Sequence, residues 1–162
     1  LMSKFEQQIG GWNQKKVAIL GLSFKPNTDD MREAPSLVII NMLLEAGAKV
    51  KAYDPVAMKE ARHHFGDAIT YVEDQYEALI DADCLAILTE WPEFRIPNFK
   101  VIKKLLTTPV IFDGRNLLTE FAAKGYTVAA TKAEMAAAPS GRRATRLRQS
   151  TKRSASRPNI SK

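Results

Sequence analysis

From Lys16 onward, short apolar segments alternate with longer segments in which apolar residues recur at helical spacing. The apolar segments predict strands over 17–20, 50–53, 69–72, 85–88, 110–112 and 126–129. The intervening segments predict helices over 35–46, 55–65, 75–80, 99–106 and 118–124. Strands that alternate with helices pair in parallel through right-handed crossovers. The strands are nearly continuous apolar runs, which indicates a sheet covered on both faces. The fold class predicted is therefore α/β, a Rossmann-like doubly wound parallel sheet.

Individual residues mark the ends of these elements. Pro35 suits the first position of a helix, and Gly47 suits the residue after its end. Most residues of this helix are apolar, so we expect it to be well buried. Asp54 ends the second strand and stands before Pro55. It either caps the next helix or occupies the place of a ribose-binding acid, and the proline favours the cap.

The pattern divides the chain of 162 residues into three parts. Residues 1–13 carry Phe5, Ile9 and Trp12 at helix-compatible spacing, which is typical of the end of a preceding helical region. Residues 14–132 form the Rossmann-like domain, about one domain by the usual length prior. Residues 133–162 are rich in Ala, Ser, Arg and Thr with almost no large apolar residues, so we expect a disordered basic tail.

The net charge of +6 belongs to the tail rather than to the domain. Residues 139–162 contain eight of the 24 Lys and Arg residues and no acid, which leaves 16 basic against 18 acidic residues before them. A general nucleic-acid surface on the domain is therefore not expected. A single cysteine excludes an internal disulfide, and no apolar run approaches the roughly 20 residues that span a bilayer. We expect a cytoplasmic protein without a membrane partner.

Ligands of open α/β sheets bind beyond the carboxyl ends of the strands. Four basic residues fall in the loops there: Lys25, Arg32, Arg95 and Arg115. Guanidinium and ammonium groups that converge at one edge favour a phosphorylated ligand. The alternative is that each pairs with a nearby acid, such as Asp30 or Glu90.

Other features argue against familiar chemistries. A dinucleotide fingerprint has three glycines after the first strand, but here Gly21 is followed by Leu22 and Ser23, so an autonomous NAD site is not expected. Cys84 begins an apolar strand and is expected to be a buried, inert thiol. His63 and His64 are expected on a solvated helix face, and no metal-ligand cluster is apparent.

Three motifs carry a family resemblance. The stretch GLSFKPNTDDMREAP, residues 21–35, resembles the start of the C-terminal domain of the UDP-glucose/GDP-mannose dehydrogenase family. The segments TEWPEF, residues 89–94, and FDGRN, residues 112–116, are similar to the UDP-glucose dehydrogenases of that family. The resemblance runs from about residue 3 to residue 127.

This resemblance implies a part of an NAD-dependent enzyme that oxidises UDP-glucose to UDP-glucuronate in two steps. Such enzymes join an N-terminal NAD-binding domain and a long central helix to this UDP-binding domain, and we expect a homo-oligomer of the full enzyme. By motif position, Phe24 and Lys25 would contact the UDP-sugar substrate, and Arg115 would hold the uridine diphosphate. Arg32 would reach the NAD cofactor across the domain interface.

Two parts of the family pattern are not matched. The family's catalytic cysteine lies in a glycine-rich segment ahead of the central helix, and Cys84 does not occupy that place. The glycine fingerprint of the NAD domain is also unmatched, so we expect the isolated chain to be inactive, with no catalytic residue of its own. The alternative is a stand-alone nucleotide-binding or assembly module whose cationic tail docks on an acidic partner. The tail lacks interleaved aromatic residues for stacking on bases, so nucleic acid is not the expected partner.

Overall fold

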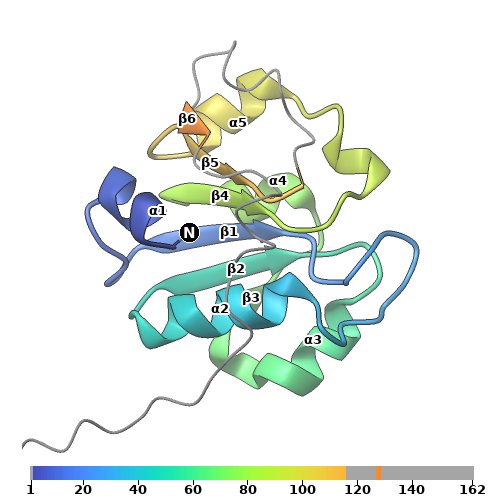
Figure 1. Cartoon of the computed structure of the whole chain (residues 1–162). Coiled ribbons are helices and arrows are strands. Elements are labelled where there is room, and N and C mark those ends of the chain that lie inside the picture. The colour runs from blue at the N-terminus through green and yellow to red at the C-terminus, as the bar shows by residue number, and fades with distance from the viewer. Residues whose placement is uncertain (1, 116–126, 129–162) are drawn as a thin grey trace, which may run out of the picture.

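The computed structural model describes residues 2–115 and 127–128, which form one parallel sheet with helices packed on it (Figure 1). Its six strands lie in the order β3-β2-β1-β4-β5-β6. The strands are β1 Lys16–Leu20, β2 Lys49–Tyr53, β3 Thr70–Tyr71, β4 Cys84–Ile87, β5 Val110–Asp113 and β6 Thr127–Val128. All five neighbouring pairs are parallel. Strands β2 and β3 are added on one side of β1, and strands β4 to β6 are added on the other side. This is the order of a doubly wound sheet, so the predicted fold class is confirmed.

Two apolar cores lie on opposite faces of this sheet. The helices are α1 Met2–Ile9, α2 Pro35–Glu45, α3 Met58–Phe65, α4 Gln75–Leu79 and α5 Phe99–Leu105, with 3₁₀ turns η1 Gly66–Ala68 and η2 Pro92–Phe94. Residues of α2 and α3 pack with Val17 and Ile19 of β1. Residues of α4 and α5 pack with Ala18 and Leu20. Successive side chains of a strand point to opposite faces, so β1 separates and supports both cores.

The expectation of full cover on both faces is wrong for β2. Strands β4 and β5 are buried at every position, whereas β2 alternates, with Lys49 exposed and Lys51 half-buried. The cause is the length of α4, which packs against β1 and β2. A helix of five residues is about 7.5 Å long, whereas a strand of five residues spans about 17 Å. The amino-terminal half of β2 therefore stays open on that face.

Helix α2 is also less buried than its sequence predicts. Ile40 and Leu43 lie in the core, but the side chains of Val38 and Met42 are 54% and 42% exposed. One turn separates Val38 from Met42, so they form an apolar stripe on the outer side of the helix.

The structure describes the start of the chain more fully than the region after residue 115. Ile9 at the end of α1 and Trp12 are buried in the same core as α2. The last predicted strand, 126–129, corresponds to β6 at Thr127–Val128. The predicted helix over 118–124 and the tail from 133 lie outside the described residues. Within residues 2–115 and 127–128, the structure has no helix long and apolar enough to cross a membrane.

Candidate nucleotide-binding edge of the sheet

The carboxyl ends of the central strands meet at one edge of the sheet. Leu20, the last residue of β1, lies beside Ile87 of β4, which in turn lies beside Asp113 of β5. The loops that leave these strands begin at Gly21, Leu88 and Gly114, so they start next to one another. The structure therefore brings together the three family-like motifs, which are far apart in the sequence.

Buried polar side chains gather at this edge. Among the described residues, five polar or charged side chains are buried. They are Ser23 after β1, Ser36 in the first turn of α2, Asp54 after β2, Thr89 after β4, and Asp113 at the end of β5. Burying a polar group is costly unless it is hydrogen-bonded, so these side chains are placed where the backbone needs partners.

Gly21 follows β1 and lies against Thr89, which follows the neighbouring strand β4. Its φ is +92°, and an added Cβ would lie 2.5 Å from Cβ of Thr89 and 2.6 Å from its backbone nitrogen. The first loop therefore rests directly on the end of β4. In NAD-binding Rossmann domains the pyrophosphate of the dinucleotide lies beside this first turn.

Side chains from three other elements hold the main chain of Leu22 and Ser23. Both N–H groups donate to Oδ2 of Asp54, at 2.7 and 3.1 Å. The hydroxyl of Ser36 donates to the carbonyl of Leu22, and the Thr89 hydroxyl donates to the carbonyl of Ser23 at 2.6 Å. The loop conformation is thus fixed by contacts distant in sequence.

Phe24 continues this arrangement and is clamped by Arg115. The Phe24 N–H donates to the carbonyl of Asp30 at 2.8 Å. The Arg115 guanidinium donates from Nη2 to the Phe24 carbonyl and from Nε to the Leu88 carbonyl, both at 2.8 Å. Arg115 therefore joins the loops after β1, β4 and β5. Phe24 is nonetheless 44% exposed. Its main-chain N–H and carbonyl are both hydrogen-bonded, so an exposed residue stands on a fixed backbone.

Asp54 is not the N-cap of α3 that the sequence favours, because Ala57 holds that position and α3 has no side-chain cap. Its Oδ1 accepts the N–H groups of Val56 and Ala57, in the turn before α3, which begins only at Met58. Its Oδ2 accepts the loop N–H groups and the indole N–H of Trp91 at 3.1 Å. Both oxygens of this buried carboxylate are engaged. A role as an open ribose-binding acid is thereby excluded.

The remaining loop cations differ in their partners. Arg32 forms a two-point ion pair with Asp30, and its side chain is 88% exposed. The hydrogen bonds from Arg32 lower the pKa of the Asp30 carboxyl to about 2. Arg95 lies 3.7 Å from Glu90, and Lys25 is exposed next to Phe24. Pairing with nearby acids thus holds for Arg32 and Arg95, whereas the bonds found for the Arg115 guanidinium run to backbone carbonyls.

The cysteine and the two histidines lie where the sequence predicts, in a buried strand and on an exposed helix face. Cys84 is fully buried, and burial raises the pKa of its thiol to about 12, which removes it as a nucleophile at neutral pH. His63 and His64 lie on α3 within reach of Glu60. The described part of the chain holds no group of three His, Cys, Asp or Glu side chains placed to bind a metal.

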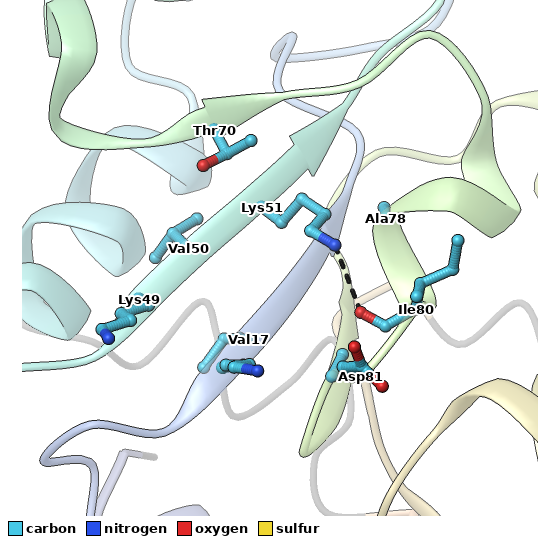
Figure 2. Close-up of a pocket in the computed structure, with 10 residues that line it drawn as sticks. Val17, Lys49, Val50, Lys51, Thr70, Ala78, Ile80 and Asp81 are labelled. Carbon is cyan, nitrogen blue, oxygen red and sulfur yellow. Dashed lines mark hydrogen bonds between the residues drawn. The ribbon is translucent and has the colours of Figure 1, made fainter.

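A cavity that the sequence does not predict lies near the other edge of the sheet. It has a volume of about 280 Å³ and is lined by lysines at the start of β1 and on β2, and by the segment after α4 (Figure 2). Lys51 crosses it and donates to the carbonyl of Ile80 at 3.2 Å. This is the open part of β2 left by the short α4. It is remote from the loops that carry the motifs.

Fold, strand order and loop geometry define a doubly wound, Rossmann-like domain of the nucleotide-binding type. The profile of the UDP-glucose/GDP-mannose dehydrogenase family, UDP binding domain, matches residues 18–120. The chain therefore belongs to the UDP-glucose/GDP-mannose dehydrogenase family and contains its UDP-binding domain.

Individual relatives agree with this assignment. A UDP-glucose 6-dehydrogenase of Bacillus subtilis is 46% identical over 128 residues, which cover 78% of this chain and 28% of that protein. A UDP-glucose 6-dehydrogenase of Pseudomonas aeruginosa is 44% identical over 113 residues, 67% of this chain and 25% of that protein. This chain thus spans about a quarter of the length of the curated relatives it matches.

Solved structures are similar as well. A UDP-glucose dehydrogenase of Pyrobaculum islandicum is 39% identical with a TM-score of 0.62, covering 69% of this chain and 24% of that one. An NDP-N-acetyl-D-galactosaminuronic acid dehydrogenase of Methanosarcina mazei is 28% identical with a TM-score of 0.67, covering 80% and 27%.

Proposed function

We propose that this chain is the UDP-binding part of an NAD-dependent UDP-glucose 6-dehydrogenase. The observation that carries the proposal is the clustering of buried polar side chains at the carboxyl edge, where they fix the main chain of Leu22 and Ser23. Ordering a loop in advance removes an entropic cost from ligand binding. The loop presents the exposed side chains of Phe24 and Lys25 at the edge where ligands of such sheets bind.

The nucleotide, rather than the sugar, is the proposed target of this domain. The solved relatives are named for different sugars, glucose in one case and N-acetyl-galactosaminuronic acid in another. Both align with this chain, so the sugar does not explain what they share. Lys25 supplies an ammonium for the diphosphate, and the ring of Phe24 supplies an apolar surface beside it. Arg115 is proposed to hold the uridine diphosphate from its position between the loops, where its guanidinium bonds the carbonyls of Phe24 and Leu88.

NAD is proposed to be held mainly by another domain of the complete enzyme. The glycine fingerprint of a dinucleotide site is unmatched in the loop after β1, where Gly21 is followed by Leu22 and Ser23. Arg32 is the proposed contact to the cofactor, because its guanidinium projects from the edge into solvent. The chain alone is therefore proposed to have no dehydrogenase activity, since its single cysteine is buried with a strongly raised pKa.

Calorimetric titration of the 162-residue chain with UDP tests the proposal. We expect saturable binding that weakens about tenfold, or about 1.4 kcal/mol, in Lys25→Gln, since the lysine bonds a charged phosphate. Lys104→Gln is the matched control, because Lys104 is an exposed lysine in the last turn of α5, at the end of the helix away from the loop after β4. Equal affinity of the wild type and the Lys25 variant would remove Lys25 from the site. Absence of UDP binding by the wild type would refute the function.

A further inference from the structure

The most heavily hydrogen-bonded side chain at the carboxyl edge belongs to a residue that the family motifs do not single out. Asp54 accepts from main-chain N–H groups of four residues, from the Ser23 hydroxyl at 3.3 Å and from the Trp91 indole. It is buried and cannot reach a ligand on the loops. Any effect of Asp54 on binding must therefore act through its partners.

The two carboxylate oxygens have separate tasks. Oδ1 bonds the turn at Val56 and Ala57, which leads from β2 into α3. Oδ2 bonds Leu22, Ser23 and Trp91, which belong to the loops after β1 and β4. Asp54 thus ties the end of β2 to both loops that flank the proposed nucleotide.

We propose that Asp54 is a positioning residue for nucleotide binding: it sets the backbone of Leu22 and Ser23, and so the direction in which Phe24 and Lys25 face the ligand. This inference rests on the proposed UDP-binding function. Phe24 follows Ser23 directly, so any rotation of the Ser23 backbone redirects both ligand-facing side chains. The Ser23 hydroxyl adds a second link, because it lies within hydrogen-bond distance of both Oδ2 of Asp54, at 3.3 Å, and the Lys25 carbonyl, at 3.0 Å, and its one proton is shared between them.

An asparagine distinguishes this role from that of an ordinary helix cap. A carboxylate accepts at both oxygens, whereas an amide accepts only at one end and donates at the other. In Asp54→Asn, the NH₂ group must face N–H donors either at the turn or at the loop, whichever way it is rotated. A buried donor that faces another donor loses its hydrogen bond and repels it.

Asp74 provides a matched control. It caps α4, and both of its bonds, from Tyr76 and Glu77, run to Oδ1. In Asp74→Asn the amide oxygen can keep these two bonds, because asparagine is as good a cap as aspartate. The same chemical change is therefore expected to be nearly silent at Asp74 and damaging at Asp54.

The experiment measures UDP affinity and amide hydrogen exchange of the full chain, at a temperature where each variant is folded. We expect Asp54→Asn to bind UDP at least tenfold more weakly and to exchange faster at Leu22 and Ser23, while β1 exchanges as in the wild type. Asp74→Asn is expected to bind within twofold of the wild type. Unchanged affinity in Asp54→Asn, with the wild type binding normally, would overturn the positioning role. A wild type that does not bind UDP would instead overturn the proposed function.

A milder variant keeps the inference testable if Asp54→Asn does not fold. Trp91→Phe retains an aromatic ring but removes the N–H that holds Oδ2. We expect about threefold weaker UDP binding and faster exchange at Ser23. No change in either quantity would contradict the inference.

Discussion

Gly21→Ala is the substitution whose cost the structure defines most sharply. The residue has φ of +92°, and its main-chain N–H donates to the carbonyl of Tyr53 at 2.9 Å. An alanine there adds a methyl group at 2.5 to 2.7 Å from the Cβ, backbone nitrogen and hydroxyl of Thr89. Thr89 cannot withdraw easily, since it is fully buried and its hydroxyl holds the Ser23 carbonyl.

Two costs add in this variant. Placing a residue with a Cβ in a sparsely populated backbone region costs about 2 kcal/mol. Forcing an extra methyl group against a packed strand end costs about 2 kcal/mol more. The sum of about 4 kcal/mol corresponds to a fall in Tm of about 12 °C for a chain of this size.

Thermal unfolding followed by circular dichroism measures this fall, and Gly66→Ala is the control. Gly66 also has a positive φ, of +51°, but a Cβ there meets nothing within 4 Å. We expect the control to lose about 2 kcal/mol, or about 6 °C, from backbone strain alone. Equal losses in the two variants would contradict the close approach of Gly21 to Thr89.

Two further predictions concern titratable groups. Cys84 is buried with a thiol pKa of about 12, so a thiol-specific reagent at pH 8 should label the native chain far more slowly than the denatured chain, and rapid native labelling would contradict the burial. Asp30 has a pKa lowered to about 2 by Arg32, so this pair favours the folded state above the ordinary carboxyl pKa of 3.8, and the effect is lost as the pH falls through 2. A carboxyl NMR titration should find this low midpoint and see it rise in Arg32→Gln; a normal midpoint in the wild type would exclude the ion pair in solution.

Much of the fold could be predicted because apolar runs and helix ends are local signals. The strands β1, β4 and β5 are buried on both faces, and their continuous apolar runs indicate that directly. The motif loops could be placed for a topological reason, since the carboxyl ends of parallel strands share one edge. Lys25, Arg32 and Arg115 follow from that rule.

The supporting residues of the site could not be predicted in the same way. Ser36 and Thr89 have no signal of their own, because their importance comes from a carbonyl that lies 14 or 66 residues away. Asp54 could be placed at a strand end, but the predicted helix cap is wrong, since α3 begins at Met58 with Ala57 as its N-cap. The bonds of Asp54 to the first loop depend on tertiary packing. The open half of β2 likewise depends on the short length of α4. The alternating Lys-Val-Lys-Ala-Tyr sequence of β2 is the pattern that indicates a strand exposed on one face.

The direct test of nucleotide binding at the carboxyl edge is a UDP titration of the ¹⁵N-labelled chain followed by NMR. We predict saturable shift changes at residues 22–25, 88–90 and 114–115, with Lys49 and Lys51 unmoved. The cavity beside β2 offers lysines without the ordered loop, so it serves as an internal control. Shifts confined to that cavity, or none at UDP concentrations in the millimolar range, would contradict the proposed site.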